Sequence, residues 1–440
     1  EIYTPDNQLI TTLYDGIESD ISNEFGRFAV IYNGYTDDYI KVIGFNNDLD
    51  YKIKVVAKED GTTLKVGLYT SPHLVDFRER MKVSGLESED GKVTFIGDEE
   101  AICRANVFLR TTERILLKVD KFKAYTFDEL FENTKKIPWE KYLPSDAKFW
   151  VAKATSIKSK LFSPSDIQSI IKKAIVERLK SVYHINWFEE TGNSYPIRVN
   201  IMKDEVSICL DTSGESLHKR GYRKLSGKAP LTETLASAII MLSPWKNDRI
   251  LVDPFCGSGT IPIEAAMIGA NIAPGMNREF ISDKWNNLIK KQLWYDTIEE
   301  ANDLIDNNVE MIIQGYDIDS EIVKLARANA KLAGVDKHIH FQTRPLSELS
   351  HNKKYGFIIT NPPYGERLED KKDMPRLYKE IGERYNKLDS WSAYIITGYE
   401  DAQKYIGRKA DKNRKIYNGM LKTYLYQYMG PKPPRKKIEE

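Results

Sequence analysis

The sequence predicts an α/β fold in which a parallel sheet occupies the C-terminal half of the chain and an α+β region precedes it. Three short, largely apolar runs support this prediction, and they cover residues 249–253, 311–317 and 357–360. Such runs are typical of buried strands. Open α/β sheets bind ligands at the carboxyl ends of their strands, so we expect the polar residues that end these runs to share one site.

The run 357–360 stops abruptly at Asn361, Pro362, Pro363 and Tyr364. The side-chain oxygen of Asn361 and the carbonyl of Pro362 can accept both N–H bonds of an exocyclic amine. The ring of Tyr364 can stack on the base that carries this amine. An ordinary Asn-Pro turn is the competing interpretation of the tetrapeptide when it is considered alone.

A glycine-containing turn and an apolar helix, predicted over 261–268, follow the run 249–253. The glycines let a ligand approach the backbone, and the start of the helix presents unpaired N–H groups. The turn lacks the third glycine of a dinucleotide fingerprint and the lysine of a phosphate loop. A carboxylate therefore suits this helix better than a pyrophosphate. The run 311–317 ends at Asp317, which is placed to accept both hydroxyls of a ribose.

Three motifs in this order carry a family resemblance: Asp-Pro-Phe-Cys-Gly-Ser-Gly-Thr, Gly-Tyr-Asp-Ile-Asp and Thr-Asn-Pro-Pro-Tyr-Gly-Glu-Arg-Leu. They resemble class I S-adenosylmethionine-dependent RNA methyltransferases with a THUMP domain, and more closely the ribosomal large-subunit guanine-N2 methyltransferases. The resemblance runs from about residue 90 to about residue 434. It implies a Rossmann-like methyltransferase domain preceded by a THUMP-like RNA-binding domain.

The same resemblance implies S-adenosyl-L-methionine as the cofactor and assigns roles to residues of the three motifs. The implied cofactor-binding residues are Asp253, Phe255, Cys256, Gly257, Ser258, Gly259, Thr260, Asp317 and Ile318. The implied catalytic residues, which would hold the target base, are Asn361, Pro362, Pro363 and Tyr364.

The resemblance also implies domain boundaries. It assigns 86–222 to the THUMP-like domain, 223–430 to the methyltransferase domain and 431–440 to a basic tail. Residues 1–85 stay unassigned, as either a ferredoxin-like or a foreign segment. Within them, 65–81 resemble a segment of folylpolyglutamate synthases, but the nucleotide-binding loop of that family is absent from the sequence.

The implied reaction is methyl transfer to N2 of guanine in 23S ribosomal RNA or a ribosomal precursor. Such a transfer needs alignment more than a strong base, and alignment can contribute up to about 7–11 kcal/mol. Three alternatives stay open: guanine N2 of transfer RNA, a protein glutamine amide, and a non-catalytic RNA-binding ribosome-assembly protein. Intact Asp253, Asp317 and Asn361 favour an enzyme.

The charge distribution favours RNA over protein as the substrate. The chain has a formal charge of +1, but residues 1–64 carry twelve acidic and five basic side chains. Residues 150–228 carry fourteen basic and eight acidic side chains, a local excess that suits phosphate contact. The predicted RNA contacts, which have Ser, Gly and Tyr neighbours typical of loops, are Lys158, Lys160, Lys219, Arg220 and Arg223.

Composition excludes other classes of protein. The longest apolar run is shorter than eighteen residues, so we expect no membrane span. The three cysteines are too scattered for a disulfide framework or a zinc site. We expect a cytoplasmic protein without a metal, and the oligomeric state stays open.

Two departures from the usual class I pattern concern the surroundings of the site. Pro345 stands where an acid usually contacts the adenine, so that contact stays unassigned. Residues 271–310 form a predicted insertion, whose Trp285 and Trp294 either help cover the active site or pack against the sheet.

Overall fold

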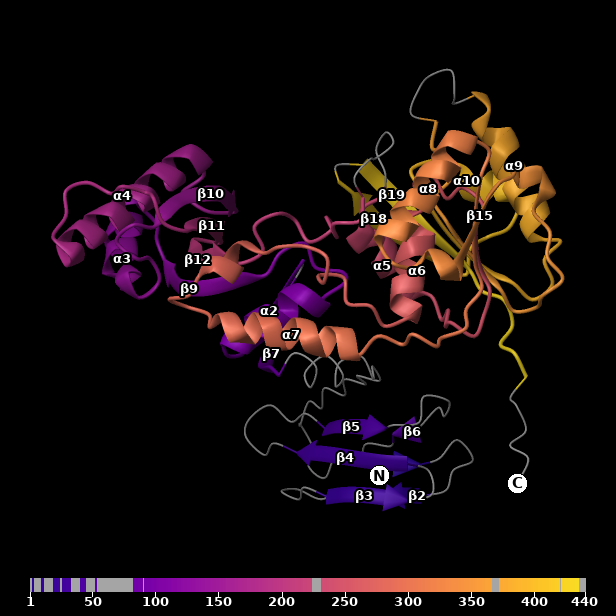
Figure 1. Cartoon of the computed structure of the whole chain (residues 1–440), viewed down its shortest axis with the longest axis horizontal. Coiled ribbons are helices and arrows are strands. Elements are labelled where there is room, and N and C mark those ends of the chain that lie inside the picture. Colours follow the sequence, from indigo (N-terminus) through magenta and orange to yellow (C-terminus); the bar gives the residue numbers. More distant parts are fainter. Residues whose placement is uncertain are drawn as a thin grey trace, which may run out of the picture. The chain divides into compact units, whose positions relative to one another are not determined.

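The computed structural model describes residues 82–434, apart from 90, 224–230, 366–371 and 420, together with six short strands before residue 54 (Figure 1). The chain divides into two compact units, Glu1–Gly97 and Asp98–Glu440. The segment 65–81, with its resemblance to folylpolyglutamate synthases, lies outside the described residues.

The described part of the first unit consists of antiparallel strands. Two three-stranded sheets have the orders β2-β1-β6 and β3-β4-β5, and β7 pairs with β8. The strands are β1 (Ile2–Tyr3), β2 (Leu9–Thr11), β3 (Ser19–Asn23), β4 (Gly26–Tyr32), β5 (Ile40–Gly44), β6 (Lys52–Ile53), β7 (Ser84–Glu89) and β8 (Lys92–Ile96).

The second unit begins with helix α2 (Glu99–Phe108), whose N-cap Asp98 accepts a hydrogen bond from the backbone of Ala101. A four-stranded sheet of order β10-β11-β12-β9 follows. Its elements are β9 (Leu116–Lys123), α3 (Phe127–Lys136), η1 (Trp139–Lys141), β10 (Lys148–Ile157), α4 (Pro164–Tyr183), β11 (Ser194–Met202) and β12 (Glu205–Asp211). Strand β10 is parallel to β11, and the other pairs are antiparallel.

One face of the four-stranded sheet packs against helices α3 and α4. Alternate residues of the strands, such as Val151, Val199 and Ile208, are buried in a common core with Ile171 and Leu130 of these helices. Successive side chains of a strand point to opposite faces of the sheet, so alternate burial is typical of a sheet with one covered face. The residues between them point to the other face of the sheet.

A seven-stranded sheet of order β15-β14-β13-β16-β17-β19-β18 forms the rest of the second unit. The first five strands in this order are parallel, and β19 runs antiparallel to both of its neighbours, β17 and β18. The strands are β13 (Leu251–Asp253), β14 (Ile313–Asp317), β15 (Ile339–Thr343), β16 (Phe357–Thr360), β17 (Ser392–Thr397), β18 (Lys412–Asn418) and β19 (Leu421–Tyr428).

Helices cover both faces of this sheet (Figure 1). Phe357 and Ile359 of β16 belong to the core with α5, α6 and α8, whereas Ile358 belongs to the core with α9 and α10. The helices are α5 (Glu233–Leu242), α6 (Thr260–Gly269), α8 (Ser320–Leu332), α9 (Met374–Tyr385) and α10 (Ala402–Ile406), with short turns η3 (Asp336–His338) and η4 (Leu346–Glu348). The predicted α/β fold class is therefore confirmed.

The predicted insertion after α6 packs away from the seven-stranded sheet. It contains η2 (Ile281–Lys284) and α7 (Lys291–Asp303), and α7 lies against α2 (Figure 1). Trp285 is fully buried in the core of the four-stranded sheet, where its ring stacks on Tyr195 with centroids 4.8 Å apart. The insertion thus links the two sheets of the second unit.

No helix in the described part of the chain combines the length and the apolar character that a bilayer span requires.

Candidate active site

The three motif-bearing strands are neighbours in the sheet. Strand β13 pairs in parallel with β14 on one side and with β16 on the other. Parallel neighbours end at the same edge, so the structure brings Asp253, Asp317 and Asn361 to one edge of the sheet. The strand order also reverses at β13, because β14 follows on one side and β16 on the other. Such a switch point is where open α/β sheets form their ligand crevice.

Asp253 joins two of the motifs directly. Its carboxylate accepts a hydrogen bond from the hydroxyl of Thr360 at 2.6 Å and another from the backbone N–H of Phe255 at 3.1 Å. Both Asp253 and Thr360 are 1 % exposed. Burial raises the pKa of Asp253 from 3.8 to about 7, against the lowering effect of these two hydrogen bonds. The residue before Asn361 is therefore anchored to the residue that precedes the glycine turn.

The glycine turn adopts the backbone conformation that its sequence suggests. Gly257 and Gly259 have φ angles of +52° and +86°, in the left-handed region that favours glycine. A side chain at Gly259 would meet Phe341 at 3.0 Å and Ala326 at 3.1 Å. The turn is also tied to the second motif, since the backbone N–H of Gly257 donates to the carboxylate of Asp317 at 3.1 Å.

Helix α6 starts at the end of this turn with Thr260. The carbonyl of Ser258 accepts a hydrogen bond at 3.0 Å from the buried side-chain amide of Asn329 in α8.

Burial raises the pKa of Cys256 well above its usual value, which keeps the thiol protonated and argues against a nucleophilic role.

The Asn-Pro-Pro-Tyr loop is held from the far side by α9 and β17. The buried hydroxyl of Tyr378 donates to the carbonyl of Pro363 at 3.0 Å and is hydrogen-bonded to Thr397. The ring of Tyr364 lies against Gly398, where a β-carbon would come within 3.2 Å of it. The hydroxyl of Tyr364 donates to the side-chain oxygen of Asn361. Asn361 and Tyr364 are both partly exposed and can be reached from solvent.

The other predicted cofactor residues differ in exposure. Asp317 and Phe255 are partly exposed, and Ile318, which follows Asp317 in the chain, is 77 % exposed. Pro345 caps the short turn η4 after β15. Glu348 at the end of that turn lies 3.6 Å from the guanidinium of Arg344, so its carboxylate already has a cationic partner.

The structure does not bring the five predicted RNA contacts together. Lys158 and Lys160 follow β10 and are exposed. Lys219 is also exposed, but it lies at the opposite end of the sheet. Strands β10 and β11 are parallel and β12 is antiparallel to β11, so the segment after β12 leaves the sheet at the end where β10 begins. A cavity of about 800 Å³ near Lys219 is also lined by Arg220 and Arg223.

Arg220 and Arg223 are engaged inside the protein. Arg220 is 2 % exposed, donates to the carbonyl of Leu217 at 2.9 Å and lies 3.6 Å from buried Glu264. Arg223 lies 3.1 Å from buried Glu233 and donates to the hydroxyl of Thr260. The burial of Arg220 argues against its predicted contact with RNA phosphates, and the hydrogen bond from Arg223 to Thr260 ties Arg223 to the first residue of α6.

Sequence reasoning missed several residues of the site. Thr360 reads as the last residue of an apolar strand, and Tyr378 and Gly398 lie outside any motif. Gly315 belongs to the motif Gly-Tyr-Asp-Ile-Asp but had no assigned role, and a β-carbon there would come within 2.7 Å of Phe341 under the glycine turn. A glycine inside an otherwise apolar strand is a sequence signal for such a close approach.

Comparisons with known protein families match most of the second unit. The family model described as "RMKL-like, methyltransferase domain" matches residues 220–427. A THUMP domain model matches residues 124–211, and an RlmL ferredoxin-like domain model matches residues 79–116.

Curated relatives and solved structures agree with these matches. The chain is 48 % identical over 354 residues to the provisionally named RNA methyltransferase YpsC of Bacillus subtilis, covering 80 % of this chain and 91 % of YpsC. It is 32 % identical to the ribosomal RNA large subunit methyltransferase K/L of Syntrophotalea carbinolica, over 76 % of this chain and 48 % of that protein. The crystal structure of SMU.472, a provisionally named methyltransferase complexed with SAH, superposes with a TM-score of 0.75 at 42 % identity, covering 82 % and 96 % of the two chains.

Proposed function

Because the chain belongs to the family of RMKL-like methyltransferases that carry a THUMP domain, we propose that it methylates the exocyclic N2 of a guanine in 23S ribosomal RNA. The methyl donor is S-adenosyl-L-methionine, in keeping with the SAH-bound relative. The proposed division is 86–222 for RNA binding and 223–430 for catalysis, with a cytoplasmic location.

The residues of the glycine turn fit this cofactor. A β-carbon at Gly257 would meet no atom within 4 Å, so the backbone there is open to a ligand, and Asp317 offers a carboxylate suited to two ribose hydroxyls. Asp253 adds a buried carboxyl group within the same turn. S-adenosyl-L-methionine supplies a methyl group that is already activated on a sulfonium, so the protein's task is to orient the acceptor.

Asn361, Pro362 and Tyr364 are the proposed acceptor site. The Asn361 oxygen and the Pro362 carbonyl accept the two N–H bonds of the guanine amine, which favours the pyramidal nitrogen that attacks. Tyr364 stacks on the ring after the base leaves its helix or loop. The hydrogen bond from the Tyr364 hydroxyl to Asn361 leaves the second lone pair of that oxygen for the base.

One observation carries the proposal: the direct hydrogen bond from Thr360 to Asp253. It means that the cofactor turn and the base-holding loop are parts of one rigid edge. Alignment of the donor and the acceptor is thus built into the sheet, which is where most of the rate enhancement of such a transfer arises.

The choice of 23S ribosomal RNA comes from the K/L relatives. The chain spans about half the length of those relatives, so the substrate of the whole relative is a proposal for this chain. Guanine N2 of transfer RNA remains the second candidate substrate, because the same loop would hold the same base. A glutamine amide is a weaker candidate, since a THUMP domain has no role on a protein substrate.

Mass spectrometry of RNA tests the proposal. Nucleosides from 23S ribosomal RNA and transfer RNA of cells lacking the gene should be compared with those of the parent. We expect one N2-methylguanosine to be missing from 23S ribosomal RNA, and restored by the wild-type gene. Asn361→Ala should fail to restore it while the purified variant keeps its calorimetric affinity for S-adenosyl-L-methionine. A loss confined to transfer RNA would overturn the choice of substrate, and an active Asn361→Ala variant would overturn the acceptor site.

A further inference from the structure

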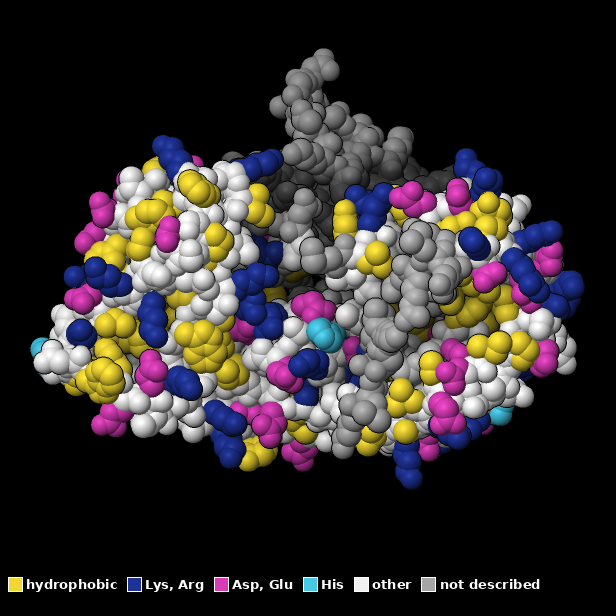
Figure 2. All heavy atoms as spheres, turned by 90° about the horizontal axis from the view of Figure 1, so that it is seen from above, with side chains coloured by type: hydrophobic (Ala, Val, Ile, Leu, Met, Phe, Trp, Pro, Cys, Tyr) yellow, Lys and Arg dark blue, Asp and Glu magenta, His cyan; other side chains and the backbone are white. Residues whose placement is uncertain are grey.

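The face of the four-stranded sheet opposite α3 and α4 carries cationic and polar side chains. Across the strands β10, β11, β12 and β9, one row in register consists of Lys153, Arg198, Cys209 and Lys118. The next row consists of Thr155, Asn200, Ser207 and Lys121. In Figure 2, Lys and Arg side chains lie among hydrophobic ones on the left part of the visible surface, the side on which the four-stranded sheet and its helices lie in Figure 1.

A β-bulge in β10 increases the number of exposed side chains on this face. The register shifts between Val151 and Lys153, so that Ala152 and Lys153 are both exposed opposite Arg198. Bulges re-aim side chains in this way and are frequent beside functional sites. Trp150, just before the bulge, is 37 % exposed although it is the largest type of side chain.

A pocket of about 410 Å³ lies at one end of this face, between the sheet and the insertion. The sheet contributes Trp150, Ala152, Pro196 and Arg198, and the insertion contributes Phe280, Ile281 and Lys284. Pockets of roughly 300–1,000 Å³ hold small organic ligands. The pocket therefore has room for one nucleoside but not for a base-paired helix.

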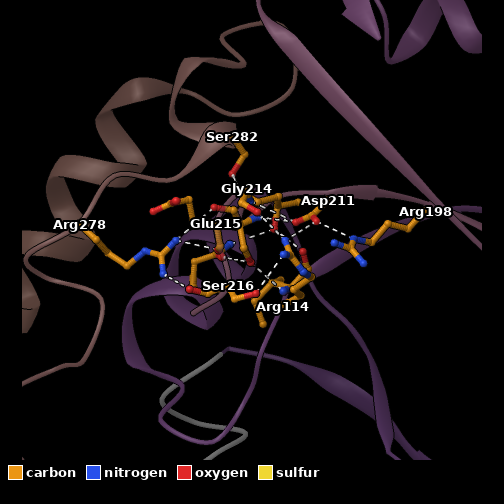
Figure 3. Close-up of polar contacts among 12 residues, drawn as sticks. Arg114, Arg198, Asp211, Gly214, Glu215, Ser216, Arg278 and Ser282 are labelled. Carbon is orange, nitrogen blue, oxygen red and sulfur yellow. Dashed lines mark hydrogen bonds and ion pairs between the residues drawn. The ribbon is translucent and has the colours of Figure 1, made fainter. Parts of the chain in front are cut away.

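Ion pairs and hydrogen bonds connect the residues at the floor of the pocket (Figure 3). Asp211 is 1 % exposed, and its carboxylate accepts hydrogen bonds from Arg114 at 2.6 Å and from Arg198 at 2.7 Å. Arg278 of the insertion donates to the carbonyls of Glu215 at 2.8 Å and Ser216 at 2.7 Å. These bonds hold the segment after β12 against the insertion, so the pocket exists before any ligand arrives.

We propose that this pocket binds one unpaired nucleotide of the RNA substrate, outside the methylated position. The base stacks on Trp150, as bases of single strands do on aromatic side chains. The adjoining phosphates lie along Arg198, Lys153 and Lys118. Glu279, which also lines the pocket, is 4.0 Å from Lys284 in an exposed pair that a phosphate can replace. The inference rests on the proposed function, because it takes RNA as the substrate.

The test compares matched variants of the full chain. A short single-stranded RNA oligonucleotide and a duplex of the same sequence serve as probes. Trp150→Ala should weaken binding of the single strand about tenfold, the usual effect of removing one stacking platform. Trp187→Ala is the matched control, since Trp187 is 81 % exposed in the same region and outside the pocket. It should bind like the wild type.

Charge reversal gives an independent readout. Lys118→Glu with Lys153→Glu should reduce the slope of log K against log salt by about 0.7 per lost phosphate contact. The control reverses Lys136 and Lys173, which are exposed on α3 and α4 on the opposite side of the sheet.

With 4-thiouridine in the RNA, ultraviolet crosslinks should map to the peptide that contains Trp150.

Three results would overturn the proposed nucleotide pocket: unchanged binding by Trp150→Ala, equal effects of the two charge reversals, or a preference of the protein for the duplex. Failure of the proposed function looks different, because the wild-type protein would then bind the oligonucleotide through Trp150 and yet transfer no methyl group to ribosomal RNA.

Discussion

Asp253 is a buried carboxyl group whose protonation affects the stability of the active-site edge. Its neighbours are two hydrogen-bond donors and the carboxylate of Asp317, which raises its pKa further after the larger effect of burial. Burial favours the neutral form of Asp253, whereas a cation beside the group would favour the charged form. In the proposed cofactor site the sulfonium of S-adenosyl-L-methionine would be such a cation, so cofactor binding and deprotonation of Asp253 should favour each other.

The pKa of Asp253 predicts how stability depends on pH. The folded pKa of about 7 lies above the unfolded value near 3.8. Between these values the folded state binds more protons, so this group's contribution to the free energy of unfolding falls as the pH rises. The total loss is on the order of 4 kcal/mol. In urea unfolding of the cofactor-free protein from about pH 5 to about pH 8, Asp253→Asn should gain stability relative to the wild type as the pH rises.

The control for this experiment is Asp120→Asn, since Asp120 is exposed on β9. Its difference from the wild type should stay constant with pH. A pH-independent difference for Asp253→Asn would contradict the assigned pKa. The asparagine retains an oxygen that can accept the hydrogen bond from Thr360, so the comparison isolates the charge.

Single residues also show where sequence reasoning stops. Arg220 and Arg223 occur in a basic cluster with Lys219, and the sequence alone cannot separate exposed members from buried ones. The structure separates them because Glu264 and Glu233, from helices α6 and α5, meet their guanidinium groups. Both acids lie in apolar helical stretches, where a buried partner for them is expected only once the helices are packed.

At the scale of elements, the strands were predicted well and the connections between them were not. The run 357–360 is β16, and 249–253 and 311–317 contain β13 and β14. Local apolar patterns suffice for such elements. The insertion was assigned to the site or to the sheet of the methyltransferase region, because nothing local identifies Tyr195 as the partner of Trp285.

The contact between α2 and α7 includes one buried cation. Arg104 in α2 has a side chain only 3 % exposed, and it donates to Glu300 of α7 at 2.7 Å. Glu300→Ala should lower the free energy of unfolding by about 1.5–3 kcal/mol, the usual range for hydrogen bonds to charged groups. Thermal or urea unfolding measures this loss.

Glu299→Ala is the matched control, because Glu299 is the exposed neighbour in the same helix and the substitution has the same effect on helix propensity. It should change the midpoint by much less. Equal effects of the two variants would show that the α2–α7 contact does not depend on this ion pair.

In the second unit the insertion connects two sheets with separate cores, so we expect the two sheets to unfold together. Trp285 follows α6 of the seven-stranded sheet but is 0 % exposed in the core of the four-stranded sheet, where its indole N–H donates to the carbonyl of Ser194 at 2.9 Å. Replacement of a buried Trp by Ala costs about 3–5 kcal/mol. Because Trp285 belongs to the insertion, its replacement should weaken the packing that connects the two sheets.

Calorimetry of Trp285→Ala should therefore resolve two unfolding transitions for the unit Asp98–Glu440 where the wild type shows one, with the four-stranded sheet unfolding first. Affinity for S-adenosyl-L-methionine should stay near the wild-type value, because the cofactor turn lies on the other sheet. Trp187→Ala, with an exposed ring, should keep the single transition. If Trp285→Ala also kept a single transition at a lower temperature, the coupling of the two sheets would have to come from α7 and α2 instead. The RNA-binding and catalytic sheets would then be coupled by helix packing and not by this tryptophan.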